Sequence, residues 1–262
     1  MVIGSVVRSA AIASALVCSG VICHGDESRA AVSARTLAGF PRTMLWAWHR
    51  PEDLRGLDRQ KVGVAFLAAT WFLGPDGPRI EPRAQPLLVD PGTPLMAVVR
   101  IEAATKPLPA YDGRQIRGMA ASLAEIVARS GAGGLQIDYD ATSSEHAFYR
   151  QLLQETRVAL GERPLSMTAL LSWCTGDEPL LAAPVDEVVP MSFQLGVPGA
   201  AGLKARAASG ELRSRRCTSA IGVSTDEPTP ELEGDRRLYI FSPTAWTPAA
   251  ARRALREVSA WR

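Results

Sequence analysis

Two carboxylates and an amide alternate along one short apolar segment near the middle of the chain. Residues 134–140 read GLQIDYD, and the side chains of a β-strand repeat every two residues. Gln136, Asp138 and Asp140 therefore share one face, and the opposite face is apolar. On an antiparallel surface strand such a polar face would simply meet water. Inside a barrel it would instead place two carboxyl groups in a lumen, where they could perform acid–base chemistry.

Eight apolar, strand-like segments recur along the chain and favour the barrel. They begin near Met44, Val62, Leu95, Gly134, Leu165, Glu187, Thr218 and Leu238. Helical periodicity is expected over 114–130, 143–161 and 248–258, whereas the proline-rich stretch 74–94 has none. We therefore expect an imperfect (β/α)8 barrel of the TIM type, with some helices missing or shortened. Its site would lie where the strand carboxyl ends converge. A doubly wound open sheet is the alternative.

Length and composition agree with one such domain. The chain has 262 residues, of which 47% are hydrophobic, enough for one barrel and little more. A single barrel is predicted over residues 44–262, preceded by a linker at 26–43. The net charge of only +2 gives no electrostatic footprint for nucleic acid or an anionic membrane.

The first 25 residues are expected to be a signal peptide or an N-terminal anchor. Arg8 precedes a mostly apolar run over 10–23, which is short for a bilayer span and typical of a secretory signal. Lipidation at Cys18 or Cys23 is less favoured, because bulky residues precede both. We predict an exported protein, periplasmic or secreted, with no integral membrane domain beyond a possible N-terminal anchor. The oligomeric state stays open.

Metal, cofactor and covalent chemistry find little support in the sequence. Outside the N-terminal segment only His49 and His146 remain, and no HxH, HExxH, CxxC or GxSxG spacing occurs. We expect neither a metal nor a cofactor. The barrel model puts Cys174 and Cys217 on opposite rims, so two separate thiols are expected despite an oxidising compartment.

Carboxylates set among tryptophans suggest sugar chemistry, because glycosidic bonds are cleaved by pairs of Asp or Glu. Val98, Arg100 and Glu102 share a strand face, and we expect Arg100 and Glu102 to bridge to Asp138, either as an ionic layer or as support for catalysis. The catalytic candidates are Asp140, Asp138, Glu102 and Asp226. The substrate-binding candidates are Trp48, Trp173, Gln194, Trp246 and Arg100, although at least half of the tryptophans are expected to pack in the core.

The segment GLQIDYD resembles the strand-four signature of glycoside hydrolase family 18, a run of the form DGxDxDxE that ends in the catalytic acid. The resemblance implies that Asp140 stands where that glutamate protonates the leaving oxygen. The segment 191–194 is similar to the strand-six Met-x-Tyr-Asp of that family, and Trp246 to the tryptophan that closes its eighth strand. Phe193 and Gln194 lack the tyrosine hydroxyl and the aspartate charge that assist a substrate N-acetyl group there, so chitinase chemistry is not implied.

A longer resemblance is to a bacterial family known only as domain of unknown function 3142. It runs from about residue 45 to residue 246 and includes WxRPEDL, GVAFLAAT, AVVRIE, GLQIDYDA, LSWC, VPMSF and STDEP. The resemblance implies a barrel and export. It implies no activity, because none is established for that family.

Three functions remain open on the sequence. The first is a glycoside hydrolase-like enzyme that cleaves a bacterial polysaccharide or oligosaccharide, with Asp140 as general acid and Asp226 or Glu102 as the second carboxylate. The second is a non-catalytic barrel that binds glycans. The third is an exported structural or assembly protein whose carboxylates lock the core. Carboxylates spaced in an open cleft would favour the first, and carboxylates buried in complete ion pairs the third.

Overall fold

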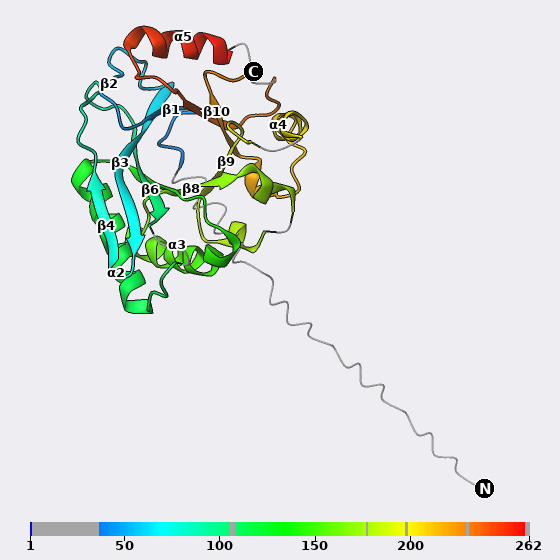
Figure 1. The fold of residues 1–262 in the computed structure, drawn as a ribbon. Coiled ribbons are helices and arrows are strands. Elements are labelled where there is room, and N and C mark those ends of the chain that lie inside the picture. Colours follow the sequence, from blue (N-terminus) through cyan, green and yellow to red (C-terminus); the bar gives the residue numbers. More distant parts are fainter. Residues whose placement is uncertain (2–36, 105–107, 177, 197–198, 229–230, 260–262) are drawn as a thin grey trace.

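Eight parallel strands close into a ring at the centre of the molecule (Figure 1). The computed structural model describes residues 1, 37–104, 108–176, 178–196, 199–228 and 231–259. The barrel strands are β1 (Thr43–Ala47), β3 (Val62–Gly74), β6 (Leu95–Ala103), β7 (Gly134–Asp138), β8 (Leu165–Leu170), β9 (Glu187–Met191), β10 (Ala220–Ser224) and β11 (Arg237–Phe241). Because β1 pairs with both β3 and β11, the sheet is closed. The barrel is confirmed, and the open sheet is excluded.

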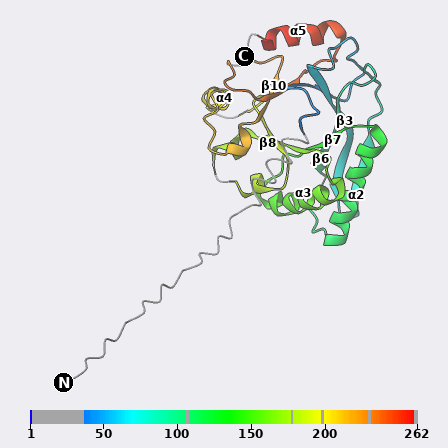
Figure 2. The ribbon, with the colours of Figure 1, turned by 180° about the vertical axis from the view of Figure 1, so that it is seen from behind.

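Four α-helices lie outside the ring in the described part of the chain. They are α2 (Gly113–Ser130), α3 (His146–Leu160), α4 (Ala200–Ala208) and α5 (Pro248–Ser259). Three match the predicted helical stretches, and α2 begins at an Asp112 capping box and ends at Gly131, whose φ of 69° is left-handed. The pair α2 and α3 lies on the side of the barrel opposite α5 (Figure 2). The sequence missed α4, because its alanine-rich turns carry little apolar periodicity.

Several crossovers hold no α-helix among their described residues, as the imperfect repeat predicted. The strand β3 runs on beyond the ring and folds back as antiparallel β4 (Gly77–Pro82), and β2 (Glu52–Asp53) pairs with β5 (Leu87–Leu88). Short 3-10 turns stand at η1 (Ser143–Glu145), η2 (Leu171–Thr175), η3 (Pro179–Ala182) and η4 (Arg215–Cys217). The barrel wall is therefore covered by turns and loops on part of its circumference.

One of these irregular stretches overturns an expectation. Cys174 and Cys217 form a disulfide with a Cα–Cα distance of 6.0 Å, not two separate thiols. The prediction assumes that Cys174 lies at the mouth of the barrel and Cys217 at its opposite rim. Instead, η2 keeps Ser172 at the pocket and then places Cys174 in the outer core, where its carbonyl accepts a hydrogen bond from the backbone N–H of Ser214. The two crossovers thus meet on the outer wall.

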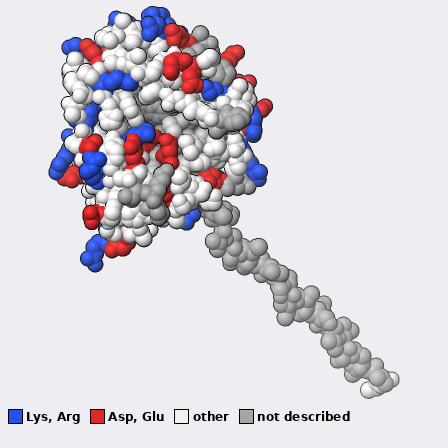
Figure 3. Space-filling model, viewed as in Figure 1, with Lys and Arg blue, Asp and Glu red and all other residues white. Residues whose placement is uncertain are grey.

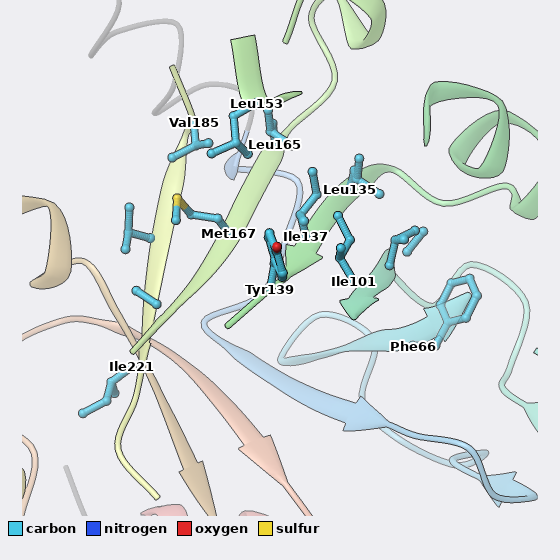
Figure 4. Close-up of a cluster of buried hydrophobic side chains, with 14 of the residues drawn as sticks. Phe66, Ile101, Leu135, Ile137, Tyr139, Leu153, Leu165, Met167, Val185 and Ile221 are labelled. Atoms are coloured by element: carbon cyan, nitrogen blue, oxygen red, sulfur yellow. The ribbon is translucent and has the colours of Figure 1, made fainter. Parts of the chain in front are cut away.

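The core has two layers, one between strands and helices and one inside the ring. In the outer layer Leu135 and Ile137 of β7 lie beside Leu165 of β8, with Leu153 of α3 packed near Leu165 (Figure 4). The inner layer consists of Phe40, Met44, Trp46, Ala65, Met96, Val98, Val189, Ala220 and Tyr239. Gly222 makes room there, because a Cβ atom would come within 2.9 Å of the Trp46 ring.

The amino-proximal end of the lumen is closed by an ionic cluster and by the chain before β1. Glu187 accepts hydrogen bonds from Arg237 Nε at 3.0 Å and from the Tyr239 hydroxyl at 2.7 Å. Arg237 also donates to the carbonyl of Phe40 at 2.7 Å. Residues 37–42 of the predicted linker therefore pack against the barrel. The predicted signal segment lies outside the described residues, and none of the described helices is long and apolar enough to cross a membrane.

Candidate active site

A pocket of about 420 Å³ opens at the carboxyl end of the strands. One side carries polar side chains from β6, β7 and β8 and the segments that follow them: Arg100, Asp138, Asp140, Thr168 and Ser172. The other side is largely apolar: Trp48, Met191, Phe193, Leu195 and Phe241. Acidic side chains gather beside a basic one around a hollow near the middle of the face drawn in Figure 3. The pocket is thus two-sided, with charge on one side and aromatic rings on the other.

Asp138 is the buried carboxylate of the pocket. It is 6% exposed, accepts a hydrogen bond from Thr168 Oγ1 at 2.8 Å and pairs with Arg100 Nη1 at 3.3 Å. Burial raises the pKa of Asp138, while the Arg100 cation and the Thr168 hydroxyl act in the opposite direction. The predicted bridge from Arg100 to Asp138 is present, and it holds the carboxylate in one orientation.

Asp140 lies one step further out on the same face. It is exposed at the mouth, and it makes no hydrogen bond or ion pair with another described residue. The surrounding wall still restricts its hydration, so partial burial raises the pKa of Asp140, opposed by the positive charge of Arg100. A free carboxyl group with a raised pKa is what a general acid requires.

The two other catalytic candidates are placed differently. Glu102 accepts a hydrogen bond from Arg100 Nε at 2.8 Å, so it stands behind the guanidinium and does not line the pocket. Asp226 accepts a hydrogen bond from the hydroxyl of Ser224 and likewise lies outside the lining. The structure therefore brings Arg100, Glu102, Asp138 and Asp140 together and leaves Asp226 apart.

The apolar side is built from stacked rings. Phe193 and Phe241 lie 5.4 Å apart and almost parallel, at 6°, while Trp48 meets Phe241 edge to face at 6.2 Å. The guanidinium of Arg100 lies 5.8 Å from the centre of the Trp48 ring. Aromatic faces of this kind can receive the C–H face of a sugar ring.

Two residues that the sequence analysis missed hold Trp48 in place. Glu52, 2% exposed, accepts hydrogen bonds from the backbone N–H of Trp48 at 3.2 Å and from that of Trp246. Arg83 donates to the carbonyls of Trp48 and Arg50. Both residues belong to the irregular crossovers. The sequence has no periodicity there from which the backbone partner of a side chain could be predicted.

Gln194 lines the mouth in a strained conformation. Its φ of 50° makes it the one non-glycine residue with positive φ in the described part of the chain. Its backbone N–H donates to Glu227 Oε1 at 2.7 Å, and Glu227 pairs with Lys204 of α4. Strain of this kind persists where surrounding contacts enforce it, and it is common at functional sites.

Trp173 and Trp246 lie away from the pocket. Trp173 packs edge to face on His146, with ring centres 5.4 Å apart. Trp246 is 1% exposed and donates from Nε1 to the carbonyl of Trp46 at 2.7 Å. Both therefore pack in the core, the alternative foreseen for half of the tryptophans.

The histidines serve as local hydrogen-bonding groups. His49 Nε2 lies 3.3 Å from Thr70 Oγ1, and burial, followed by the charge of Arg83, lowers the pKa of His49. His146 Nε2 lies 3.2 Å from the carbonyl of Ala141, and its Nδ1 lies 3.1 Å from Glu178. Among the residues that the structure describes, no cluster of three or more His, Cys, Asp or Glu could hold a metal ion.

Fold and site together define an eight-stranded α/β barrel with carboxyl groups at the carboxyl-terminal mouth. The family model described as domain of unknown function (DUF3142) matches residues 91–207, which confirms the resemblance seen in the motifs. That match contains β6 to β9, hence Arg100, Asp138, Asp140 and Gln194. No curated protein sequence matches this chain.

A solved structure has the same architecture. Bacteroides thetaiotamicron EndoBT-3987 with Man5GlcNAc product superposes with a TM-score of 0.50 at 13% identity, over 86% of this chain and 60% of that protein. The same protein in complex with Man9GlcNAc2Asn substrate gives a TM-score of 0.49 at 13% identity, over 87% and 66%. This chain thus spans less than two thirds of the first structure, and at such identity the likeness shows the fold alone.

Proposed function

We propose that the protein is a glycan-active barrel that hydrolyses a bacterial polysaccharide or oligosaccharide, with Asp140 as the proton donor. One observation carries the proposal: Asp140 stands without a partner among the described residues, above the Asp138–Arg100 pair and in the same pocket as the stacked Phe193 and Phe241 rings. A sugar ring lying on an open face of that stack would present its polar edge to the opposite side of the pocket.

The roles divide according to burial. Asp140, at the mouth, is accessible to the leaving oxygen and has the raised pKa of a donor. Asp138 is buried and positions the polar side through Arg100 and Thr168. Gln194 at the rim and Trp48 on the wall would bind the substrate. The likeness to a protein solved with Man5GlcNAc product agrees with a glycan as partner.

A non-catalytic glycan-binding barrel is the second candidate, and one observation favours it. Hydrolysis needs a second carboxylate beside the acid. Glu102 is bound by Arg100 and Asp226 by Ser224, and neither lines the pocket. If neither side chain reorients when substrate binds, the remaining carboxylate is Asp138, which is buried and paired with Arg100, and the barrel would then bind glycan without turnover.

Incubation of the purified protein with a panel of bacterial exopolysaccharides and peptidoglycan separates these functions. On a substrate that is cleaved, Asp140→Asn should reduce kcat by about 10²- to 10⁴-fold, the usual contribution of a general acid. Because Asp140 is exposed, the variant should keep the fold. Undiminished turnover by Asp140→Asn would refute the assignment, and binding without turnover by wild type would establish the second candidate.

We also propose that the protein is exported, on the strength of the N-terminal pattern alone. Mass spectrometry of periplasmic and culture fractions should find a form lacking about the first 25 residues. An intact Met1 in those fractions would indicate an uncleaved anchor, and recovery of the protein only from cytosol would refute export.

A further inference from the structure

Carboxylates outnumber cations in the described part of the pocket. Asp138 and Asp140 line it, Glu102 stands directly behind Arg100, and Arg100 is the cation among the lining residues. Arg100 is engaged on two sides, with Glu102 at 2.8 Å and Asp138 at 3.3 Å. The nearby Lys204 is paired with Glu227. With the carboxyl groups ionised, the described groups leave the polar side with an excess of negative charge.

The excess charge has a definite location. The one cation of Arg100 faces three carboxylates: Glu102 and Asp138 contact it, and Asp140, which is not in contact with it, lies at the mouth. A cleft with low-dielectric walls focuses such a charge on whatever enters. The wall opposite is aromatic, which excludes water from one side of a bound ring and strengthens the attraction on the other.

We propose that the pocket selects a glycan whose ring carries a free, protonated amino group, such as a hexosamine polymer from which N-acetyl groups have been removed. The inference rests on the proposed function, since it names the substrate class of the same site. An amino group is attached at the ring edge, so a ring lying on an open face of the Phe193–Phe241 stack can direct its ammonium toward Asp140. A uronate ring in the same place would set two anions against each other.

The protonation state of the carboxyl groups sets the pH at which this substrate would bind. The pKa values of both Asp138 and Asp140 are raised in the free protein, first of all by burial. A bound ammonium group would stabilise the ionised form of each, so binding should release protons at a pH where the carboxyl groups are partly protonated. Proton donation needs the protonated form of Asp140, so the affinity for this substrate should rise and kcat should fall as the pH rises through the pKa of Asp140. A neutral or N-acetylated ring brings no such charge.

Calorimetric titration with matched pentasaccharides tests the proposal. The probes are a fully N-acetylated glucosamine pentamer, the fully deacetylated pentamer and a glucose pentamer of the same linkage. Wild type should bind the deacetylated pentamer about tenfold more tightly than the other two, the order expected of one partly desolvated ion pair. Raising the salt from about 0.05 to about 0.5 M should reduce the preference.

Two isosteric variants locate the charge. Asp140→Asn should abolish the preference for the deacetylated pentamer. Glu162→Gln removes the same charge from the exposed turn between α3 and β8, at the opposite end of the barrel, and should preserve the preference. Equal or tighter binding of the acetylated pentamer, or a preference that survives in Asp140→Asn, would overturn the proposal.

Turnover is read separately from affinity, so the two proposals can fail independently. A deacetylated pentamer that binds preferentially but is never cleaved upholds the substrate class and refutes hydrolysis. Cleavage of an acetylated or neutral glycan together with absent binding of the deacetylated pentamer upholds hydrolysis and refutes the substrate class.

Discussion

Arg100 and Asp138 lie in register on neighbouring strands, with Nη1 of the guanidinium 3.3 Å from Oδ2 of the carboxylate. Because β6 and β7 are hydrogen-bonded side by side, the distance is set by the backbone of the barrel and not by a loop. The pair is asymmetric in its exposure: the side chain of Asp138 is 8% exposed and that of Arg100 is 35% exposed. Removal of the Arg100 cation should therefore lower the free energy of unfolding mainly by leaving the buried Asp138 carboxylate without its partner.

Replacing Arg100 by glutamine should destabilise the barrel at neutral pH. Breaking a buried pair from one side leaves an uncompensated charge, and with Arg100 partly exposed we expect a loss of about 1–3 kcal/mol in the free energy of unfolding. The double variant Arg100→Gln/Asp138→Asn should regain most of that loss. Urea denaturation of wild type, both single variants and the double variant gives the coupling. Additive losses would mean that the pair contributes nothing.

The pH dependence of turnover should report the protonation of Asp140. A proton donor acts in its protonated form, and the pKa of Asp140 is raised, so kcat should fall as the pH rises through a value above the usual 3.8. Because its pKa is raised, the protonated form of Asp140 stabilises the folded state. This contribution to the free energy of unfolding is complete below the ordinary pKa and is lost as the pH rises through the pKa of the folded protein. Carbon-13 spectra of the aspartate carboxyls, compared with Asp140→Asn, would identify the titration. A midpoint at or below 3.8 would contradict the expectation.

Reduction of the disulfide should weaken the whole domain. Cys174 and Cys217 are separated by 43 residues, and closing a loop of that length stabilises a fold by about 2–4 kcal/mol. We expect a loss of this size in Cys174→Ser/Cys217→Ser, or in wild type treated with reductant. Peptide mapping without reductant should recover the two cysteines in one linked peptide. Equal unfolding midpoints with and without reductant would show that the bond does not constrain the unfolded chain.

Gln194→Gly separates backbone strain from side-chain contacts. Glycine adopts a φ of 50° without a Cβ penalty, so the variant should gain up to about 1 kcal/mol of stability, reduced by its larger unfolded-state entropy. If the Gln194 side chain binds the glycan, affinity should fall at the same time. Gln194→Asn, which also tolerates this conformation, is the matched control. A Gly variant less stable than wild type by more than about 1 kcal/mol, the cost of glycine's unfolded-state entropy, would show that side-chain contacts outweigh the backbone strain.

Much of the fold was predictable because parallel barrel strands are buried and periodic. The alternation that put Gln136, Asp138 and Asp140 on one face holds in the structure, as does the approach of Arg100 to Asp138. These relations depend only on strand period and on which strands are neighbours. A barrel supplies both.

The features that escaped prediction lie in the crossovers. The meeting of Cys174 with Cys217 depends on how η2 turns after β8, and the hold of Glu52 and Arg83 on Trp48 depends on loop paths. The resemblance implies a substrate-binding Trp246, but its ring is buried in the outer core and donates to the carbonyl of Trp46. Loop geometry reflects many weak contacts at once, and no period in the sequence encodes it.

The disulfide also bears on how the ring can open. The pairing of β9 with β10 is in register at one position, Met191 with Gly222, whereas β10 and β11 are paired at five. Cys174 follows β8 and Cys217 precedes β10, so the covalent bond passes behind β9 and braces this thin seam from outside. Once the bond is cut, amide hydrogens along the seam should exchange with solvent sooner than those of β6 and β7. The barrel would then open locally on the side of Phe193 and Gln194, while Asp138 on the opposite side stays in place.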